Sequence, residues 1–455
     1  MTKHNSTVIG LDIGSAKTTL CVGALDALDR VEIFNLSMVR TRGMERGVIT
    51  NLGEVAECVE EVIRKAENKL SSRGRSKSKS NIDKKKIKIH SVCATISGEH
   101  IIGNNAKGVL NLSSRPVEIS QQDTQRAIDS AKSCVTSIER DILHALAREF
   151  IVNGNQRIKN PLGVYGRQLA VNLHIISCDC SFANSLIKAI NRAGLDVNGI
   201  IYSGLATSLV TLTEPEKQAG VISLELGAGT TNVLFFNEGV LQYTSVIPIG
   251  GNDITLEISR RLGIDFFQAE QLKMQYQSAA SNYKGSLTDK IIIKKTPSSY
   301  ESITREDLVR IIDEKLEQLL GRIKKDLELS GICQKVNPVR EHDSPAGLIG
   351  NNRRLKSMAF SNGVNCGIVI CGGMAFMDGI IEKLEQTLAM PVRLGIVRGF
   401  VSNLSGLNNI SHATGIGLIM HILNERKQNY KTTLPAEGIW PPFIAKLRTI
   451  YEEYF

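Results

Sequence analysis

The sequence contains one short pattern twice, and this repeat limits the folds that the chain can adopt. Residues 9–20 read IGLDIGSAKTTL, and residues 224–233 read LELGAGTTNV. In each copy an apolar run is interrupted by one carboxylate, passes through a turn of glycine and small residues, and continues into a second apolar run that contains threonine. This pattern predicts a β-hairpin with a tight turn. Two such hairpins in one chain predict two similar halves that hold one phosphorylated ligand between them.

The turns themselves have the composition of a phosphate-binding site. Glycine and small residues let the backbone approach a ligand closely, and Lys17 and the threonine hydroxyls add hydrogen-bond donors. Asp12, at the edge of the first turn, could hold a hydrated Mg²⁺. Because a hairpin with an Asp and a Gly is common without any ligand, the interpretation depends on the repeat rather than on either copy alone.

Composition limits the class of protein. A chain of 455 residues is too long for one core, so several domains are expected. The net charge of +9 comes largely from a Ser/Lys-rich segment over 69–88, which lacks the aromatic residues that stack on bases. We interpret this segment as a solvated insertion, with a weak contact to anionic lipid or nucleic acid as the alternative, and we expect no specific nucleic acid partner. Nine dispersed cysteines without a CxxC pair, and no signal peptide, indicate reduced thiols in a cytosolic protein.

Hydrophobic periodicity predicts alternating strands and helices. Asn51, Ser120 and Thr304 are expected helix N-caps. A polar loop is expected over 332–362 and a polar linker over 425–437. The predicted strands cover 8–13, 18–23, 31–40, 87–96, 169–176, 200–203, 220–237, 240–248, 291–295 and 366–371. The predicted helices cover 52–70, 120–137, 182–193, 204–213, 254–262, 266–277, 304–329, 380–388 and 410–423.

A third glycine site lies near the C-terminus, where residues 368–379 read IVICGGMAFMDG. A strand that ends in Gly372 and Gly373 lets a flat ring or a sugar lie on bare backbone. With two acid-glycine hairpins followed by this turn, the chain resembles the actin-like ATPase superfamily and, within it, the FtsA family of bacterial cell-division proteins. The resemblance covers about residues 6–330 and 364–424, and its most specific stretch is IPIGGNDITLEISRRLGIDFFQAEQLK. Further matching stretches are GLDIGSAKTT, GLATSLVTLTEPEKQAGV, LELGAGTTNVLFF, VICGGMAFMDGI and ISHATGIGL.

The resemblance implies an α/β, two-domain actin-like (ribonuclease H-like) fold with an α+β insertion in the first domain and a C-terminal amphipathic helix. The implied parts are subdomain IA over 1–89 (with the basic loop 69–88), 169–203 and 410–424; an inserted subdomain IC over 90–168; subdomain IIA over 204–253 and 364–409; and subdomain IIB over 254–330. The remaining parts are a loop insertion over 331–363, a linker over 425–437 and a membrane-targeting helix over 438–455.

The resemblance also implies ATP and Mg²⁺ as ligands. Asp12 and Glu225 would be the catalytic carboxylates, and Asp12 would hold Mg²⁺ through water. The implied phosphate contacts are Gly14, Ser15, Ala16, Lys17, Gly227, Ala228, Gly229 and Thr230, and the implied adenosine contacts are Gly372, Gly373, Met374, Glu257, Glu270 and Lys273. The second hairpin departs from the usual Asp-Ile-Gly-Gly-Gly-Thr-Thr-Asp pattern at Glu225, Ala228 and Asn232. We therefore expect ATP binding with slow or absent hydrolysis, because hydrolysis depends on accurate in-line positioning.

The last residues read GIWPPFIAKLRTIYEEYF. A helix that begins at Pro442 would carry aromatic and aliphatic residues along one side, which is typical of an interfacial membrane anchor. The alternative is a terminal helix docked on the domain. The expected lipid contacts are Trp440, Phe443, Ile444, Leu447, Ile450, Tyr451 and Phe455. Two basic and two acidic residues nearly cancel in this segment, so we expect a weak anchor that needs several tails in one polymer.

For function, the resemblance implies an ATP-binding protein that polymerises on the cytoplasmic face of the inner membrane at the division site. It would tether the FtsZ ring by binding the FtsZ C-terminal tail through residues 254–330, and would recruit later division proteins through residues 90–168. Two alternatives share the fold. One is a pilus assembly ATPase of the PilM type, and the other is a small-molecule kinase, which would need a catalytic base facing the γ-phosphate.

Overall fold

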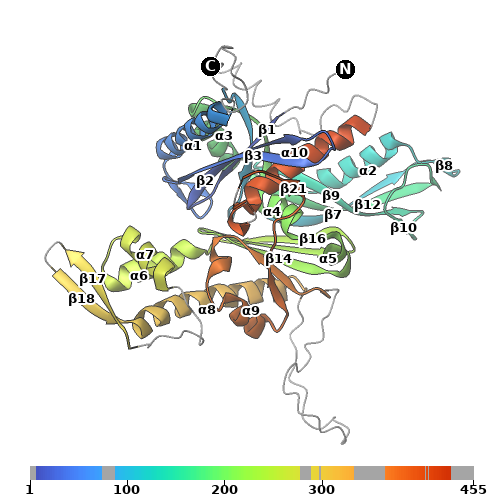
Figure 1. Ribbon diagram of the computed structural model, residues 1–455. Helices are drawn as coiled ribbons and strands as arrows, with labels where there is room; N and C mark the ends of the chain where they lie inside the picture. Colours follow the sequence, from blue (N-terminus) through green and yellow to red (C-terminus); the bar gives the residue numbers. More distant parts are fainter. Residues whose placement is uncertain are drawn as a thin grey trace, which may run out of the picture.

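The computed structural model describes residues 7–73, 88–276, 288–296, 299–332, 364–404, 406–407 and 409–431. Most of the basic segment, the expected loop after Ile332 and the expected helix over 438–455 lie outside the described residues. Figure 1 shows two lobes, with an insertion extending to one side of the first lobe and a helical arm extending to the opposite side from the second. Among the helices that are described, none is long and apolar enough to cross a membrane.

A six-stranded sheet forms the first lobe. Its order is β13 (Asp196–Tyr202), β6 (Ser91–Ile96), β1 (Val8–Ile13), β2 (Lys17–Leu25), β3 (Val31–Arg40) and β21 (Phe400–Val401). The first three strands of the chain form the antiparallel meander that the sequence predicts, and β6 adds in parallel to β1. The first hairpin therefore lies at the centre of its sheet.

Both faces of this sheet are covered, because successive side chains of a strand point to opposite sides. Leu11 and Leu20 pack in the core cluster shared with α1 (Leu52–Arg73) and α3 (Cys180–Arg192). On the other face, Cys21 packs in the core cluster shared with α10 (Ala413–Lys431). A Cβ at Gly10 would lie 2.8 Å from the Leu418 side chain, so this glycine lets α10 approach the sheet closely.

The insertion begins after β6 and returns to the first lobe at α3. Its four-stranded sheet has the order β10 (Gln156–Ile158), β9 (Arg140–Val152), β12 (Gln168–Asp179) and β7 (Ile102–Asn111). A short ribbon pairs β8 (Val117–Glu118) with β11 (Tyr165–Gly166). The helix α2 (Gln121–Ser133) packs on the sheet through Ala127 and Ala131, directly over Gly108. The insertion thus has its own small core, as expected for an α+β unit.

The second lobe repeats the central plan of the first. Its five-stranded sheet has the order β16 (Val240–Ile247), β15 (Thr231–Asn237), β14 (Val221–Leu226), β19 (Ile368–Cys371) and β20 (Val392–Leu394). The strands β14 and β15 form the second hairpin, and β19 pairs in parallel with β14. Two helices of this lobe are α4 (Ser203–Thr211), which packs against α10, and α9 (Ile380–Leu388).

The arm of the second lobe consists of α6 (Gly251–Leu262), α7 (Phe266–Tyr276), α8 (Arg305–Leu329) and the ribbon of β17 (Lys290–Thr296) with β18 (Ser299–Thr304). Apolar residues at helical spacing on α8, including Leu308, Ile312 and Leu316, are buried. The capping boxes predicted at Ser120 and Thr304 are both present, and the Asn51 side chain accepts from the amides of the first turn of α1.

Three local expectations need correction. The linker expected from residue 425 begins inside a helix, because α10 continues to Lys431. Residues 425–431 are rich in good helix formers and contain neither Gly nor Pro, and His421 pairs with Glu425 at 3.2 Å. The helix expected over 204–213 ends at Thr211, and a separate helix that was not expected, α5 (Glu214–Ala219), follows it with Pro215 in its first turn. The strand β18 was not expected.

Candidate functional site

The two repeated hairpins have the same turn geometry. In the first, the Gly14 amide donates to the Lys17 carbonyl at 3.0 Å, and in the second the Gly227 amide donates to the Thr230 carbonyl at 2.9 Å. A Cβ would lie 3.2 Å from that carbonyl oxygen at Gly14, which is a tight contact, and 2.7 Å from it at Gly227, where the backbone leaves no room for a side chain. The sequence repeat is therefore a structural repeat.

These two turns lie directly against each other, although they come from different lobes. A Cβ at Gly229 would lie 2.4 Å from the Ser15 hydroxyl oxygen. Beside them, the Ser97 hydroxyl donates to the Asn232 side-chain oxygen at 2.8 Å. The structure thus brings together the two groups of expected phosphate contacts, and a ligand between them would require the lobes to separate.

Asp12 is the ionisable group at the first turn. Its carboxylate accepts a hydrogen bond from the Thr95 hydroxyl at 2.5 Å. Burial raises the Asp12 pKa to about 6, with a further increase from the charge of Glu225 and an opposing effect from Lys17. Thr95 lies near the end of β6, and sequence reasoning did not select it, because it belongs to a strand with no motif of its own.

Lys17 connects the first turn to the last helix. Its ammonium donates to the Ser411 carbonyl, in η3 (Ile410–His412), the short helical turn that precedes α10. Burial lowers the pKa of this ammonium, while the nearby Asp12 carboxylate opposes the effect. The lysine expected to contact phosphate therefore also holds the start of α10.

The Glu225 side chain is buried, and its carboxylate oxygens accept several hydrogen bonds. Its carboxylate accepts from the Asn232 amide at 2.7 Å and from three hydroxyl groups. The hydroxyls are those of Thr414 at 2.7 Å, Thr207 at 2.9 Å and Ser203 at 3.3 Å. An ionised carboxylate has about four acceptor sites, so these donors satisfy it. None of the three hydroxyl residues was singled out from the sequence, since α4 and α10 matched the family pattern only as stretches.

The Gly-Gly turn lies on the other side of the second hairpin, next to α6. Gly372 has a φ of +89°, and a Cβ there would lie 2.4 Å from the Leu226 carbonyl oxygen, whereas a Cβ at Gly373 would meet nothing within 4 Å. Met374 lies in the short 3₁₀ helix η2 (Gly373–Phe376), and its side chain lies beside Gly251. The turn is thus built from one glycine that the backbone requires and one that leaves open space.

Of the three charged residues expected near the nucleoside, Glu270 and Lys273 lie beside the Gly-Gly turn and the start of α6. The Lys273 ammonium donates to the Gly251 carbonyl at 3.0 Å and pairs with Glu270 at 2.7 Å. Burial lowers the pKa of Lys273, and the charge of Glu270 opposes that effect. Glu257 instead bonds to Arg260 at 2.6 Å and Arg261 at 2.7 Å, and these hydrogen bonds lower its pKa to about 2.

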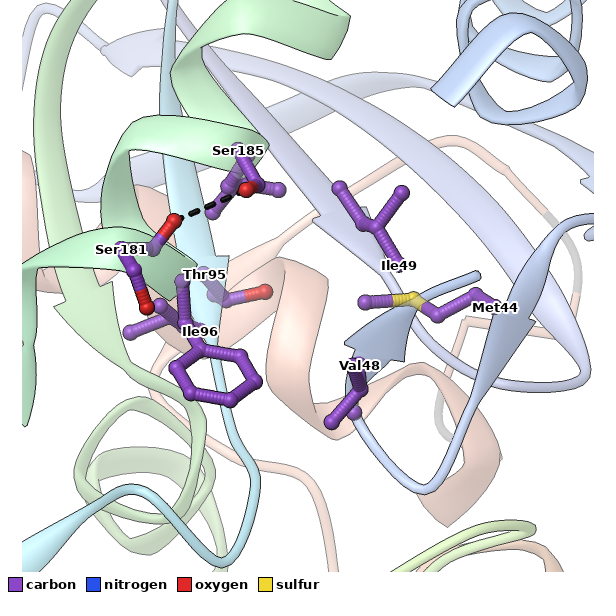
Figure 2. Close-up of a pocket in the computed structure, with 10 residues that line it drawn as sticks. Met44, Val48, Ile49, Thr95, Ile96, Ser181 and Ser185 are labelled. Atoms are coloured by element: carbon purple, nitrogen blue, oxygen red, sulfur yellow. Dashed lines mark hydrogen bonds between the residues drawn. The ribbon is translucent and has the colours of Figure 1, made fainter. Parts of the chain in front are cut away.

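A separate cavity of about 160 Å³ lies beside Thr95 in the first lobe (Figure 2). Figure 2 shows Met44, Val48 and Ile49 on one side and Ser181 and Ser185 of α3 on the other. The cavity is also lined by Gly47, Ile96, Phe182 and Leu186. Sequence reasoning did not predict it, because its lining comes from three segments that are distant in the chain.

Comparisons with known proteins decide the family. Residues 98–177 match the family model described as "SHS2 domain inserted in FTSA", and residues 222–417 match that of "Cell division protein FtsA". The chain belongs to the FtsA family. The family predicted from the three glycine sites is thereby confirmed, and the SHS2 match lies in the insertion between β6 and α3.

Relatives in the FtsA family span nearly the whole chain. The chain is 26% identical over 419 residues to the cell division protein FtsA of Pseudomonas aeruginosa, which covers 92% of this chain and 90% of that protein. It is 28% identical over 425 residues to FtsA of Borreliella burgdorferi, with 93% and 92% covered. Among solved structures, the PilM-PilN type IV pilus biogenesis complex shares the fold, with a TM-score of 0.58 and 14% identity over 91% of this chain and 98% of that chain. The predicted actin-like α/β fold is confirmed.

Proposed function

We propose that this FtsA-family chain binds ATP with Mg²⁺ between its two hairpin turns and uses the bound nucleotide to control its assembly. The observation that carries the proposal is the pair of turns closed by the same hydrogen bond, Gly14 to Lys17 and Gly227 to Thr230, which lie against each other from the two lobes. Turns of this kind present backbone amides to a phosphate chain.

The surrounding residues fit the other parts of the nucleotide. Gly373 leaves open space beside Met374, where an adenosine ring can lie on the backbone, and Lys273 with Glu270 borders the same region. Asp12 offers one carboxylate at the phosphate end, which suits an ion that keeps most of its water. Mg²⁺ would supply charge neutralisation for the phosphates.

We further propose that hydrolysis is slow or absent, because Glu225 is not free. Its carboxylate accepts from Asn232, Thr207 and Thr414, as well as from Ser203. A carboxylate that is satisfied by four fixed donors has no remaining site with which to orient an attacking water. In this protein Glu225 joins α4, β15 and α10, and its role is to hold the two lobes and the last helix in register.

The finer biological role is also a proposal, supported by the family. Residues 254–330 would bind the FtsZ C-terminal tail, copies of the chain would form a filament, and residues 438–455 would anchor that filament to the inner membrane. The structure supplies one supporting fact, because α10 ends at Lys431, and the expected anchor is therefore attached to a helix that begins at the nucleotide turns.

Nucleotide binding can be tested at Gly373. An Asp at this position enters open space, so the protein should fold, but its charge and bulk would occupy the expected adenosine region. We expect Gly373→Asp to weaken ATP binding at least tenfold in a calorimetric titration. Gly321→Asp in α8, where a Cβ also meets nothing within 4 Å, is the matched control because it adds the same side chain away from the site. Unchanged ATP affinity in Gly373→Asp would contradict the assignment of this turn.

The membrane proposal needs a separate assay. Full-length chain and the Phe443→Asp variant would be sedimented with liposomes of inner-membrane composition, with Thr449→Asp as a control that adds the same charge to the same segment. We expect Phe443→Asp to remain in the supernatant and the control to bind better. Equal sedimentation of all three proteins would refute the anchor.

A further inference from the structure

A small hairpin of the first lobe touches both phosphate-type turns. It consists of β4 (Met44–Glu45) and β5 (Val48–Ile49), joined by the two residues Arg46 and Gly47. Both turn residues have positive φ, +47° for Arg46 and +79° for Gly47. This is the pattern of a type I′ turn, which favours Asn-Gly, and an arginine is unusual in the first position.

The backbone of this turn is fixed against its neighbours. The Gly47 amide donates to the Ser15 hydroxyl oxygen at 3.2 Å, and a Cβ at Gly47 would lie 2.1 Å from the Ser97 carbonyl oxygen. A Cβ at Gly229 would lie 2.9 Å from the Cα of Arg46. Arg46 therefore lies where the two turns meet, and its backbone has little freedom to move away from them.

The Arg46 side chain reaches the other lobe. Its guanidinium bonds to the Asp253 carboxylate at 2.5 Å, in the first turn of α6. The other oxygen of Asp253 accepts from the Gly250 amide at 2.8 Å, so Asp253 keeps a partner when Arg46 leaves. Because the Arg46 side chain is 56% exposed, the ion pair adds little net stability and can be exchanged for another anion.

We propose that Arg46 contacts the terminal phosphate of a nucleoside triphosphate and exchanges Asp253 for that phosphate when the site is filled. A guanidinium presents paired donors that match phosphate oxygens, and it binds a dianionic phosphate more strongly than a carboxylate with a single negative charge. This inference rests on the proposed nucleotide site. It adds a residue that distinguishes a triphosphate from a diphosphate, because only the triphosphate extends a third group to the junction of the turns.

The test compares ATP and ADP binding to the full chain carrying Arg46→Asn. Asn removes the charge and is a preferred residue in this turn, so the hairpin should keep its shape. We expect the affinity for Mg-ATP to fall at least tenfold and the affinity for Mg-ADP to change less than twofold, measured by calorimetric titration. Arg42→Gln is the matched control, since Arg42 is a nearby exposed arginine that pairs with Glu57 at 3.2 Å.

A second variant tests the exchange from the other side. Asp253→Asn keeps an oxygen for the Gly250 amide but releases Arg46, and it should bind ATP several-fold more tightly with ADP binding unchanged. Equal losses of ATP and ADP binding in Arg46→Asn, or ATP binding that is unchanged or weaker in Asp253→Asn, would overturn the proposal. If the unmodified chain binds neither nucleotide, the proposed function itself fails. If the ligand-free Arg46→Asn variant melts at a lower temperature than the unmodified chain, its binding data do not count, and the ATP affinity of Asp253→Asn alone decides whether the proposal holds.

Discussion

The contact between α10 and α4 allows a sharp test of the packing that supports the site. A Cβ at Gly417 would lie 1.9 Å from the Ala206 carbonyl oxygen, which is backbone of α4 and cannot rotate away. Two residues earlier on the same helix, a Cβ at Gly415 would lie 3.6 Å from Thr19 and 3.7 Å from Cys21, which is ordinary contact. Gly417→Ala and Gly415→Ala therefore add the same methyl group, at Gly417 into a backbone clash and at Gly415 into ordinary contact.

The magnitudes follow from two opposing effects. Overpacking a well-filled site costs about 1–3 kcal/mol. Replacing a helical Gly by Ala returns about 0.5–1 kcal/mol. Gly417→Ala should therefore destabilise the protein by about 1–2 kcal/mol net, while Gly415→Ala should be neutral or stabilising. In a lobe of about 150–250 residues each kcal/mol shifts the melting temperature by about 2–4 °C, which a thermal scan resolves.

The assay is a thermal unfolding scan of both variants, combined with amide hydrogen exchange of α4 and α10. We expect Gly417→Ala to melt several degrees below the unmodified protein, with faster exchange confined first to these two helices. Gly415→Ala should melt at or above it. The packing argument would be refuted if Gly417→Ala were as stable as Gly415→Ala.

Further predictions concern the buried polar groups. The Asp12 pKa of about 6 exceeds its unfolded value of 3.8, so native stability should fall as pH rises from 3.8 through 6. Asp12→Asn should accordingly melt above the unmodified protein at pH 8 but not at pH 3.5. Thr414→Val removes a donor to Glu225 and should cost about 1–3 kcal/mol in urea unfolding, whereas Thr414→Ser should cost little. Burial lowers the pKa of His144 to about 3, below its unfolded value of 6.5. The stability that neutral His144 contributes is therefore complete above pH 6.5 and is lost as pH falls toward 3. Between pH 7 and 4.5 the melting temperature of His144→Gln should fall less than that of the control His90→Gln, which keeps His144.

Much of the fold follows from local pattern. The central hairpins, the caps at Asn51, Ser120 and Thr304, and the long α8 were predictable because strand alternation, helical spacing and capping chemistry are short-range signals. The end of α10 was predicted too early, since polarity was interpreted as a linker although the residues favour a helix.

The site was only partly predictable for a different reason. Glycine turns have a sequence pattern, so both hairpins and the Gly372 turn were found. The hydroxyls of Thr95, Thr207 and Thr414 have no pattern, because each becomes relevant only when tertiary packing places it beside a carboxylate. Arg46 was also missed, since its partner Asp253 is distant in sequence and belongs to the other lobe.

The position of α10 has a mechanical consequence. The start of α10 and the η3 turn before it are attached to both hairpins, through Ser411 of η3 to Lys17 and through Thr414 of α10 to Glu225. Nineteen residues at 1.5 Å each make a rod of about 28 Å. A tilt of about 10° around its attached end would displace Lys431 by about 5 Å, whereas the atoms at the turns would move by a fraction of that. Because α10 packs on the sheet of the first lobe beside Gly10 and against α4, it can turn only together with that lobe, and such a rotation would carry the displacement to the point where residues 432–455 begin.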